Sequence, residues 1–226
     1  MFQAPIHMLG AIMTDKNKRA MEIVHSGDLY NSGDPDILQV QHSRLRYMEE
    51  YNQTRTSDAD YAAREALLQK MFAAVGQGCY LEPPVHANWG GYNVSLGDHV
   101  YANFNLTLVD DGRIEIGSYV MIGPNVTITS GAHPISPALR DHDVQYNLPV
   151  IIEDHVWIGA GSIILPGVRI GKDSVIGAGS VVTKDIPAGS VAVGNPCRVI
   201  RQITEEDDRF FDHGRPIPQE IIDQYM

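Results

Sequence analysis

An aliphatic residue recurs at every sixth position through much of this chain. The longest unbroken series consists of Ile152, Ile158, Ile164, Ile170, Ile176 and Val182. The same spacing holds upstream at Leu96, Ala102 and Leu108, and, after a slip of two residues, at Ile116, Ile122 and Ile128. Four positions after many of these residues stands a small or β-branched one, such as Ser162, Val168 and Ser174.

A period of six fits neither the 3.6-residue turn of an α-helix nor the two-residue alternation of a simple strand. It fits a short strand followed by a turn, with the aliphatic residue pointing inward and glycine or asparagine at the corner. Three such units make one triangular coil of about 18 residues, and stacked coils bury a continuous aliphatic ladder. We therefore predict a mostly β chain folded as a parallel β-helix in the form of a triangular prism. The predicted coils are residues 96–113, 116–133, 152–169 and 170–187.

The chain before and after this repeat has a different pattern. "DPDILQVQHSRLRYMEEYNQT" predicts an amphipathic helix that begins at Asp34-Pro35. "YAAREALLQKMFAAVG" predicts a second helix that ends at Gly76. We expect four regions: an N-terminal extension (1–12), a helical cap (13–80), the β-helix (81–201) and an acidic, aromatic tail (202–226).

One stretch interrupts the repeat. "PISPALRDHDVQYNLP", residues 134–149, has no six-residue rhythm, and it begins directly after His133. We expect it to form a loop that protrudes from the prism. Because loops on rigid scaffolds commonly carry function, His133 becomes a candidate functional residue.

Composition excludes several classes of protein. The formal net charge of −11 argues against general electrostatic binding to nucleic acid or to an anionic membrane. No apolar run approaches the roughly 20 residues needed to cross a bilayer. Two distant cysteines, Cys79 and Cys197, fit a reduced, cytoplasmic protein better than a disulfide framework.

The chain resembles the hexapeptide-repeat sugar O-acetyltransferases, the maltose and galactoside acetyltransferases, over about residues 13–202. The resemblance is carried by "SGDLY", "MFAAVG", "EPPV", "YANFNLTLVDDG", "IGPNVTI", "HP", "VWIGAG", "ILPGV", "VIGAGSVVTKDIP" and "GNPCRVI". It implies a left-handed β-helix, an exception to the usual right-handed crossover. It also implies transfer of an acetyl group from acetyl-CoA to a sugar hydroxyl, by a homotrimer with its site between subunits.

The resemblance also implies roles for individual residues. His133 would be the catalytic base, and the backbone N–H of Ala160 would stabilise the oxyanion. The sugar would be held by Ser32, Asn88, Asn103 and Asp111. Coenzyme A would contact Asn103, Ala160, Ala178, Thr183, Lys184, Arg198 and Arg201, whose basic members supply local positive charge. No metal is expected.

Two positions depart from the family pattern. Gln145 stands where the family often has an acidic residue, which leaves the group that orients His133 open, with Asp141 or Asp143 as substitutes. Asn88 replaces the usual serine or aspartate, and Ser32 an aspartate. The acceptor is therefore open to differ from maltose and galactosides.

Three alternatives keep the prism. A γ-type carbonic anhydrase would need three grouped histidines for a metal, and the repeat rows offer His99, His133 and His155. A non-catalytic scaffold would not need the intact "YANFN", "VDD" and "HP" motifs. An acetyltransferase of an antibiotic or of serine would change only the acceptor.

Overall fold

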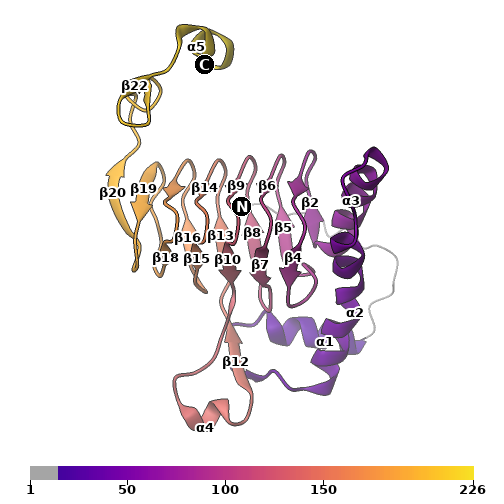
Figure 1. The fold of residues 1–226 in the computed structure, drawn as a ribbon. Helices are drawn as coiled ribbons and strands as arrows, with labels where there is room; N and C mark the ends of the chain where they lie inside the picture. The colour runs from indigo at the N-terminus through magenta and orange to yellow at the C-terminus, as the bar shows by residue number, and fades with distance from the viewer. Residues whose placement is uncertain (1–14) are drawn as a thin grey trace.

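The computed structural model describes residues 15–226, which form a β-helix with three flat sheets of mainly parallel strands (Figure 1). Sheet 1 contains β2 (Ala74–Val75), β5 (Val94–Leu96), β8 (Ile114–Ile116), β13 (Val150–Ile152) and β16 (Arg169–Ile170). Sheet 2 contains β3 (Tyr80–Leu81), β6 (Tyr101–Ala102), β9 (Met121–Ile122), β14 (Trp157–Ile158), β17 (Val175–Ile176), β19 (Ser190–Val193) and β20 (Arg198–Gln202). Sheet 3 contains β4 (Val85–Ala87), β7 (Leu106–Val109), β10 (Thr127–Thr129), β15 (Ile163–Ile164) and β18 (Val181–Val182). The predicted β-helix is confirmed.

The six-residue rows form the core. Leu96 pairs with Ile116, Ile116 with Ile152, and Ile152 with Ile170, all in parallel register. These side chains are at most 5% exposed, and Ile158 is fully buried. Since truncation of such a side chain to alanine costs about 2–5 kcal/mol, the ladder is a main source of stability.

The corners of the prism are built from turn residues and small side chains. Tyr119 and His155 adopt left-handed backbone conformations, each with φ 58°. Ser162 and Ser174 are fully buried, as expected for small residues that fill the corners. The Asp154 carboxylate accepts the backbone N–H of Ser118 from the previous coil at 2.7 Å. Successive coils are thus tied together by side chains as well as by strand pairing.

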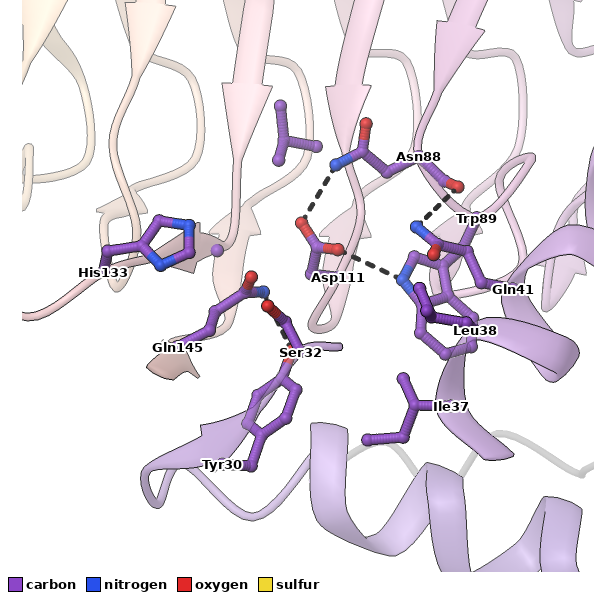
Figure 2. A pocket seen from close by; sticks show the side chains of 12 residues that line it. Tyr30, Ser32, Ile37, Leu38, Gln41, Asn88, Trp89, Asp111, His133 and Gln145 are labelled. Atoms are coloured by element: carbon purple, nitrogen blue, oxygen red, sulfur yellow. Dashed lines mark hydrogen bonds between the residues drawn. The ribbon is translucent and has the colours of Figure 1, made fainter. Parts of the chain in front are cut away.

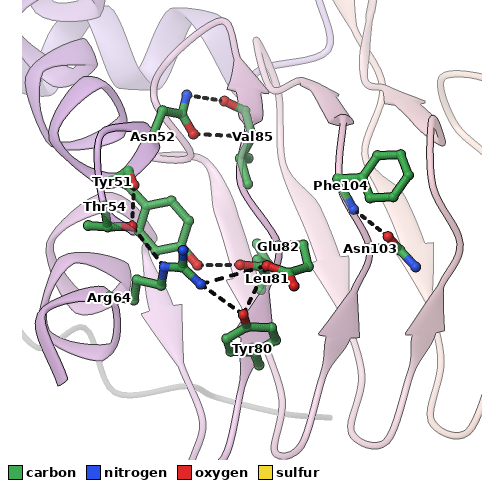
Figure 3. Close-up of polar contacts among 10 residues, drawn as sticks. All are labelled: Tyr51, Asn52, Thr54, Arg64, Tyr80, Leu81, Glu82, Val85, Asn103 and Phe104. Atoms are coloured by element: carbon green, nitrogen blue, oxygen red, sulfur yellow. Dashed lines mark hydrogen bonds and ion pairs between the residues drawn. The ribbon is translucent and has the colours of Figure 1, made fainter. Parts of the chain in front are cut away.

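Three helices, α1 (Asp15–Val24), α2 (Pro35–Asn52) and α3 (Asp58–Met71), lie at the N-terminal end of the β-helix (Figure 1). The predicted start of α2 is confirmed, because Asp34 is its N-cap and accepts the backbone N–H of Asp36 at 2.8 Å. Asn52 makes two hydrogen bonds to the Val85 backbone, each 2.8 Å long. The buried Tyr51 hydroxyl donates to the Leu81 carbonyl (Figure 3). The helices therefore dock on the first coil through polar contacts to its main chain.

The end of α3 differs from the prediction. The helix ends at Met71, not at Gly76, because Phe72 is extended, with φ −92° and ψ 153°. The N–H of Ala73 then bonds to Val94 O, and β2 pairs with β5 in sheet 1. Pairing with the next coil thus overrides the helical propensity of this segment. The stacked strands consequently begin before residue 81, the boundary expected from the sequence.

The loop after His133 is ordered by antiparallel pairing. β11 (Gly131–Ala132) pairs with β12 (Val144–Asn147), and α4 (Pro137–Arg140) lies between them. β12 also pairs with β1 (Tyr30–Asn31), so the N-terminal region and the loop form one three-stranded sheet. Figure 1 shows this unit projecting from the side of the prism.

The C-terminal residues leave the prism. β20 runs antiparallel to β19, and the chain continues through β21 (Phe210–Phe211), β22 (Arg215–Pro216) and α5 (Gln219–Tyr225), away from the last coil (Figure 1). No helix among residues 15–226 is long and apolar enough to cross a membrane. The expected extension, residues 1–12, lies outside the described residues.

Candidate active site

A pocket of about 360 Å³ lies where the prism, the loop and α2 meet (Figure 2). It is lined by Tyr30, Ser32, Ile37, Leu38, Gln41, Asn88, Trp89, Val109, Asp111, Gly131, His133 and Gln145. Four residues predicted from the sequence, Ser32, Asn88, Asp111 and His133, come together here. They belong to separate parts of the chain, and only the fold brings them together.

His133 follows β11 at the edge of this pocket. Its Nδ1 lies 2.9 Å from the Val144 carbonyl oxygen in β12. A carbonyl oxygen can only accept, so Nδ1 must carry the proton that makes this bond. In the neutral ring Nε2 then has a free lone pair and can take a proton. A main-chain carbonyl therefore orients the ring, in the role for which the sequence offered Asp141 or Asp143.

Asp111 faces the pocket at the end of β7. Its carboxylate oxygens accept the Asn88 side-chain amide and the Trp89 indole N–H, each at 3.1 Å (Figure 2). Gln41 in turn donates to the Asn88 carbonyl at 3.1 Å. A carboxylate has about four acceptor sites, so two remain for a ligand after these bonds. The arrangement presents a fixed, anionic hydrogen-bond acceptor to the pocket.

The Gln145 side chain is hydrogen-bonded to residues other than His133. Its amide nitrogen donates to the Tyr30 hydroxyl at 2.8 Å and to Asn147 Oδ1 at 2.9 Å. Burial raises the pKa of Tyr30 to about 12, so its hydroxyl stays protonated. Ser32 is tied to the same loop, because its backbone N–H and its hydroxyl both donate to the Asp143 carbonyl. Gln145 thus joins the loop to the N-terminal region.

Several lining residues were missed by the sequence analysis. Trp89 stands beside Asn88 in the motif "ANWGG", and Tyr30 closes the motif "SGDLY". Asn88 and the motif "SGDLY" were identified in the sequence, but only the tertiary structure brings Tyr30 to Gln145 and Trp89 to Asp111. Gln41 had no sequence signal beyond its place on a helix.

The other predicted residues do not line this pocket. Asn103 and Ala160 lie at the corner between sheets 2 and 3, whereas His133 follows the far end of sheet 3. Asn103 Oδ1 accepts the backbone N–H of Phe104 at 2.8 Å (Figure 3). Ala160 is exposed, and within residues 15–226 its backbone N–H has no hydrogen-bond acceptor. That N–H is therefore free to bind a ligand oxygen.

The predicted coenzyme A residues lie toward the C-terminal end. Ala178, Thr183 and Lys184 are exposed on the last coils. Arg198 donates to the Cys197 carbonyl at 2.7 Å. Arg201 forms a bidentate salt bridge with Asp207 of the tail, with N···O distances of 2.7 and 2.8 Å. The guanidinium lowers the pKa of Asp207 to about 2, so Arg201 is already neutralised by a carboxylate in this structure.

The histidines of the carbonic anhydrase alternative are not grouped. His99 and His155 stack on opposite faces of Tyr119, with ring centroids 4.9 and 5.1 Å from that of Tyr119. His133 lies at a different corner of the prism. Over the described residues, no three His, Cys, Asp or Glu side chains are placed to hold a metal ion.

Two family models match the chain. A hexapeptide repeat of succinyl-transferase matches residues 149–184, and a maltose acetyltransferase hexapeptide capping motif matches residues 24–76. The hexapeptide β-helix and its N-terminal cap are therefore similar to those of the hexapeptide-repeat acyltransferases.

Curated and solved relatives narrow the class. The chain is 52% identical over 194 residues to a galactoside O-acetyltransferase of Lactococcus lactis, covering 86% of this chain and 93% of that protein. It is 42% identical to the galactoside O-acetyltransferase of Escherichia coli, covering 86% and 95%. A galactoside acetyltransferase solved in complex with coenzyme A superposes with a TM-score of 0.81 at 40% identity, covering 87% of this chain and 96% of that one. A maltose O-acetyltransferase from Clostridium difficile has a TM-score of 0.77 at 42% identity, covering 85% and 98%.

The chain belongs to the maltose and galactoside O-acetyltransferase family. The prediction of an acetyltransferase is thereby confirmed.

Proposed function

We propose that this enzyme transfers an acetyl group from acetyl-CoA to a hydroxyl of a sugar. The observation that carries the proposal is the pocket in which His133, with Nδ1 held by the Val144 carbonyl, faces the fixed Asp111 carboxylate. Coenzyme A in a related galactoside acetyltransferase supports the donor, and the names of the relatives support the acceptor.

His133 acts as the general base. Its Nε2 removes the proton from the acceptor hydroxyl as the oxygen attacks the thioester carbonyl of acetyl-CoA. The free N–H of Ala160 stabilises the negative oxygen of the tetrahedral intermediate. The intermediate then expels the thiolate of coenzyme A, which takes the proton from His133 and leaves the acetylated sugar.

The enzyme needs no acetylated intermediate of its own. Cys79 and Cys197 do not line the pocket, and burial raises the pKa of both thiols. A protonated thiol is a poor nucleophile. Direct attack by the acceptor is therefore the simpler chemistry.

Asp111, Asn88 and Ser32 hold the acceptor. Asp111 accepts hydrogen bonds from sugar hydroxyls, and Ile37 and Leu38 add apolar surface to the pocket wall. No lysine or arginine stands among the described residues that line the pocket. This composition favours an uncharged polyol over an anionic acceptor.

The enzyme acts as a homotrimer whose sites lie between subunits. His133 and Ala160 lie at opposite ends of sheet 3 in one chain, so a single subunit cannot bring both to one acetyl group. Sheet 2 also exposes an apolar row, in which Tyr101, Met121 and Trp157 are paired side by side and 36 to 54% exposed. Such a row suits burial against a second subunit. Light scattering that gives the mass of a single chain at micromolar concentration would refute this assembly.

Coenzyme A binds along the corner that carries Asn103, Ala160 and Ala178. Thr183, Lys184, Arg198 and Arg201 then contact its phosphates and nucleotide, with charge-assisted bonds from the basic groups. For Arg201 this requires exchange of the Asp207 carboxylate for a phosphate. A cytoplasmic location, expected from the two unpaired cysteines, remains a prediction that cell fractionation tests.

The proposed function is tested by thiol release from acetyl-CoA with a panel of maltose, alkyl galactosides, a uronic acid, serine and aminoglycosides. We expect turnover with neutral sugars and little with the uronic acid or serine. Preferred acetylation of serine or of an antibiotic would keep the chemistry but replace the acceptor. No acetyl transfer to any of these compounds would count against the assigned activity.

A further inference from the structure

One buried carboxylate beside the pocket, that of Asp110, takes no part in the chemistry proposed above. Asp110 follows β7, precedes Asp111 and is fully buried. Burial raises its pKa to about 7. Because a buried acid costs free energy unless it is well hydrogen-bonded, its partners indicate what it contributes.

Both carboxylate oxygens of Asp110 bind one turn of the main chain. Oδ1 accepts the N–H of Trp89 at 2.7 Å, and Oδ2 accepts the N–H of Gly91 at 3.1 Å. The Asp110 carbonyl also accepts the Asn93 amide at 2.8 Å. Two backbone N–H groups of one turn that converge on the same carboxyl group hold that turn in place.

Close packing leaves no room for a side chain at two positions of this turn. Gly90 and Gly91 have φ values of 63° and 90°, which favour glycine. A Cβ on Gly90 would lie 2.6 Å from the Arg44 carbonyl of α2, and one on Gly91 would lie 2.8 Å from the Phe72 ring. The turn is therefore wedged between the cap and the first coil, with Asp110 as its polar anchor.

The same turn supplies both donors to Asp111. Asn88 and Trp89 bind the Asp111 carboxylate through their side chains, while Asp110 binds the Trp89 main chain from inside. Asp110 therefore binds the main chain of this turn, and Asp111 binds its side chains. The orientation of Asp111 in the pocket depends on a turn whose position Asp110 fixes.

We propose that Asp110 is a positioning residue for the acceptor, because it anchors the turn at residues 88–91 that orients Asp111 and forms a wall of the pocket. The proposal rests on the acceptor site assigned above. Asp110 itself touches neither the acceptor nor acetyl-CoA.

The test is Asp110→Asn, which keeps the shape but turns an amide N–H₂ toward one of the two backbone donors. The acceptor is whichever of maltose and methyl galactoside the wild-type enzyme acetylates faster. We expect its KM to rise about tenfold, which corresponds to the free energy of one lost buried hydrogen bond. The KM for acetyl-CoA should stay within about twofold of the wild-type value, because none of the residues proposed to bind coenzyme A belongs to this turn. Ser174→Ala is the matched control, since Ser174 is also buried and bonded to the Ser190 N–H, in a coil away from the pocket.

A double variant separates positioning from mere destabilisation. If Asp110 acts through Asp111, Asp110→Asn should add little to the acceptor KM of Asp111→Asn, whereas independent effects would multiply. A lowered melting temperature with an acceptor KM within twofold of wild type would overturn the proposal. If Asp111→Asn alone leaves the acceptor KM unchanged, the acceptor site assigned under the proposed function is wrong. That result is distinguishable from a failure of the positioning role of Asp110.

Wild-type protein provides a test that does not depend on the folding of a variant. Hydrogen-exchange mass spectrometry should find the peptide that spans residues 88–93 protected, and further protected when acetyl-CoA and the sugar are bound. Fast exchange in this peptide, or no change with the sugar, would contradict an anchored turn that supports the acceptor.

Discussion

Substitution of His133 should abolish most of the turnover and leave the fold intact. Replacement of a general base lowers kcat by about 10²–10⁴, which corresponds to about 2.7–5.5 kcal/mol of barrier. The side chain is exposed and makes one hydrogen bond, to the Val144 carbonyl. Loss of that bond costs about 1 kcal/mol of folding free energy at most. The kinetic effect should therefore far exceed any effect on stability.

Two variants separate the base from the hydrogen bond. His133→Ala removes both, whereas His133→Asn can still donate an amide N–H to Val144 but has no basic nitrogen. If Nε2 is the base, both variants lose kcat to a similar degree. His142→Ala is the matched control, since His142 is an exposed histidine of the same loop that lies outside the pocket. It should retain wild-type turnover.

The assay is release of free coenzyme A at saturating acetyl-CoA, with the melting temperature of each variant measured in parallel. A kcat within tenfold of wild type for His133→Ala would refute the assignment, as would an equal loss for His142→Ala.

Further predictions concern the tail, the N-terminus and pH. Arg201→Ala should raise the KM for acetyl-CoA at least about threefold, but not that for a thioester without the nucleotide. Asp207→Asn should lower the same KM by about two- to fivefold by freeing Arg201, while the matched charge change Asp208→Asn should not. Deletion of residues 2–12 should leave activity within about tenfold of wild type, some 1.4 kcal/mol of barrier. The raised pKa of Asp110, about 7, means that the native state holds this proton more tightly than the unfolded chain does. Its stabilising contribution is therefore present below about pH 4 and is lost as the pH rises through about 7, so wild type should lose more thermal stability over this range than Asp110→Asn.

The repeat made the fold predictable from local sequence. A six-residue period is typical of stacked β-helix coils, so the buried rows through Ile122 and Ile158 were predicted from their spacing. The break after residue 133 also located the protruding loop. Where the signal was only helical propensity, as at residues 72–76, the prediction was wrong, because pairing of β2 with β5 decided the conformation.

The candidate site was predictable only in part. Motifs identified His133 and Asp111, but not the Val144 carbonyl that orients the first or the Trp89 indole that holds the second. Gln145 binds Tyr30, 115 residues away in sequence, through antiparallel pairing of β12 with β1. Such contacts produce no repeating pattern in the sequence, because they depend on where the loop and the N-terminal helical cap meet in space. The sequence by itself therefore determined the ladder and the residue types at its corners, and the tertiary structure decided which of them share a pocket.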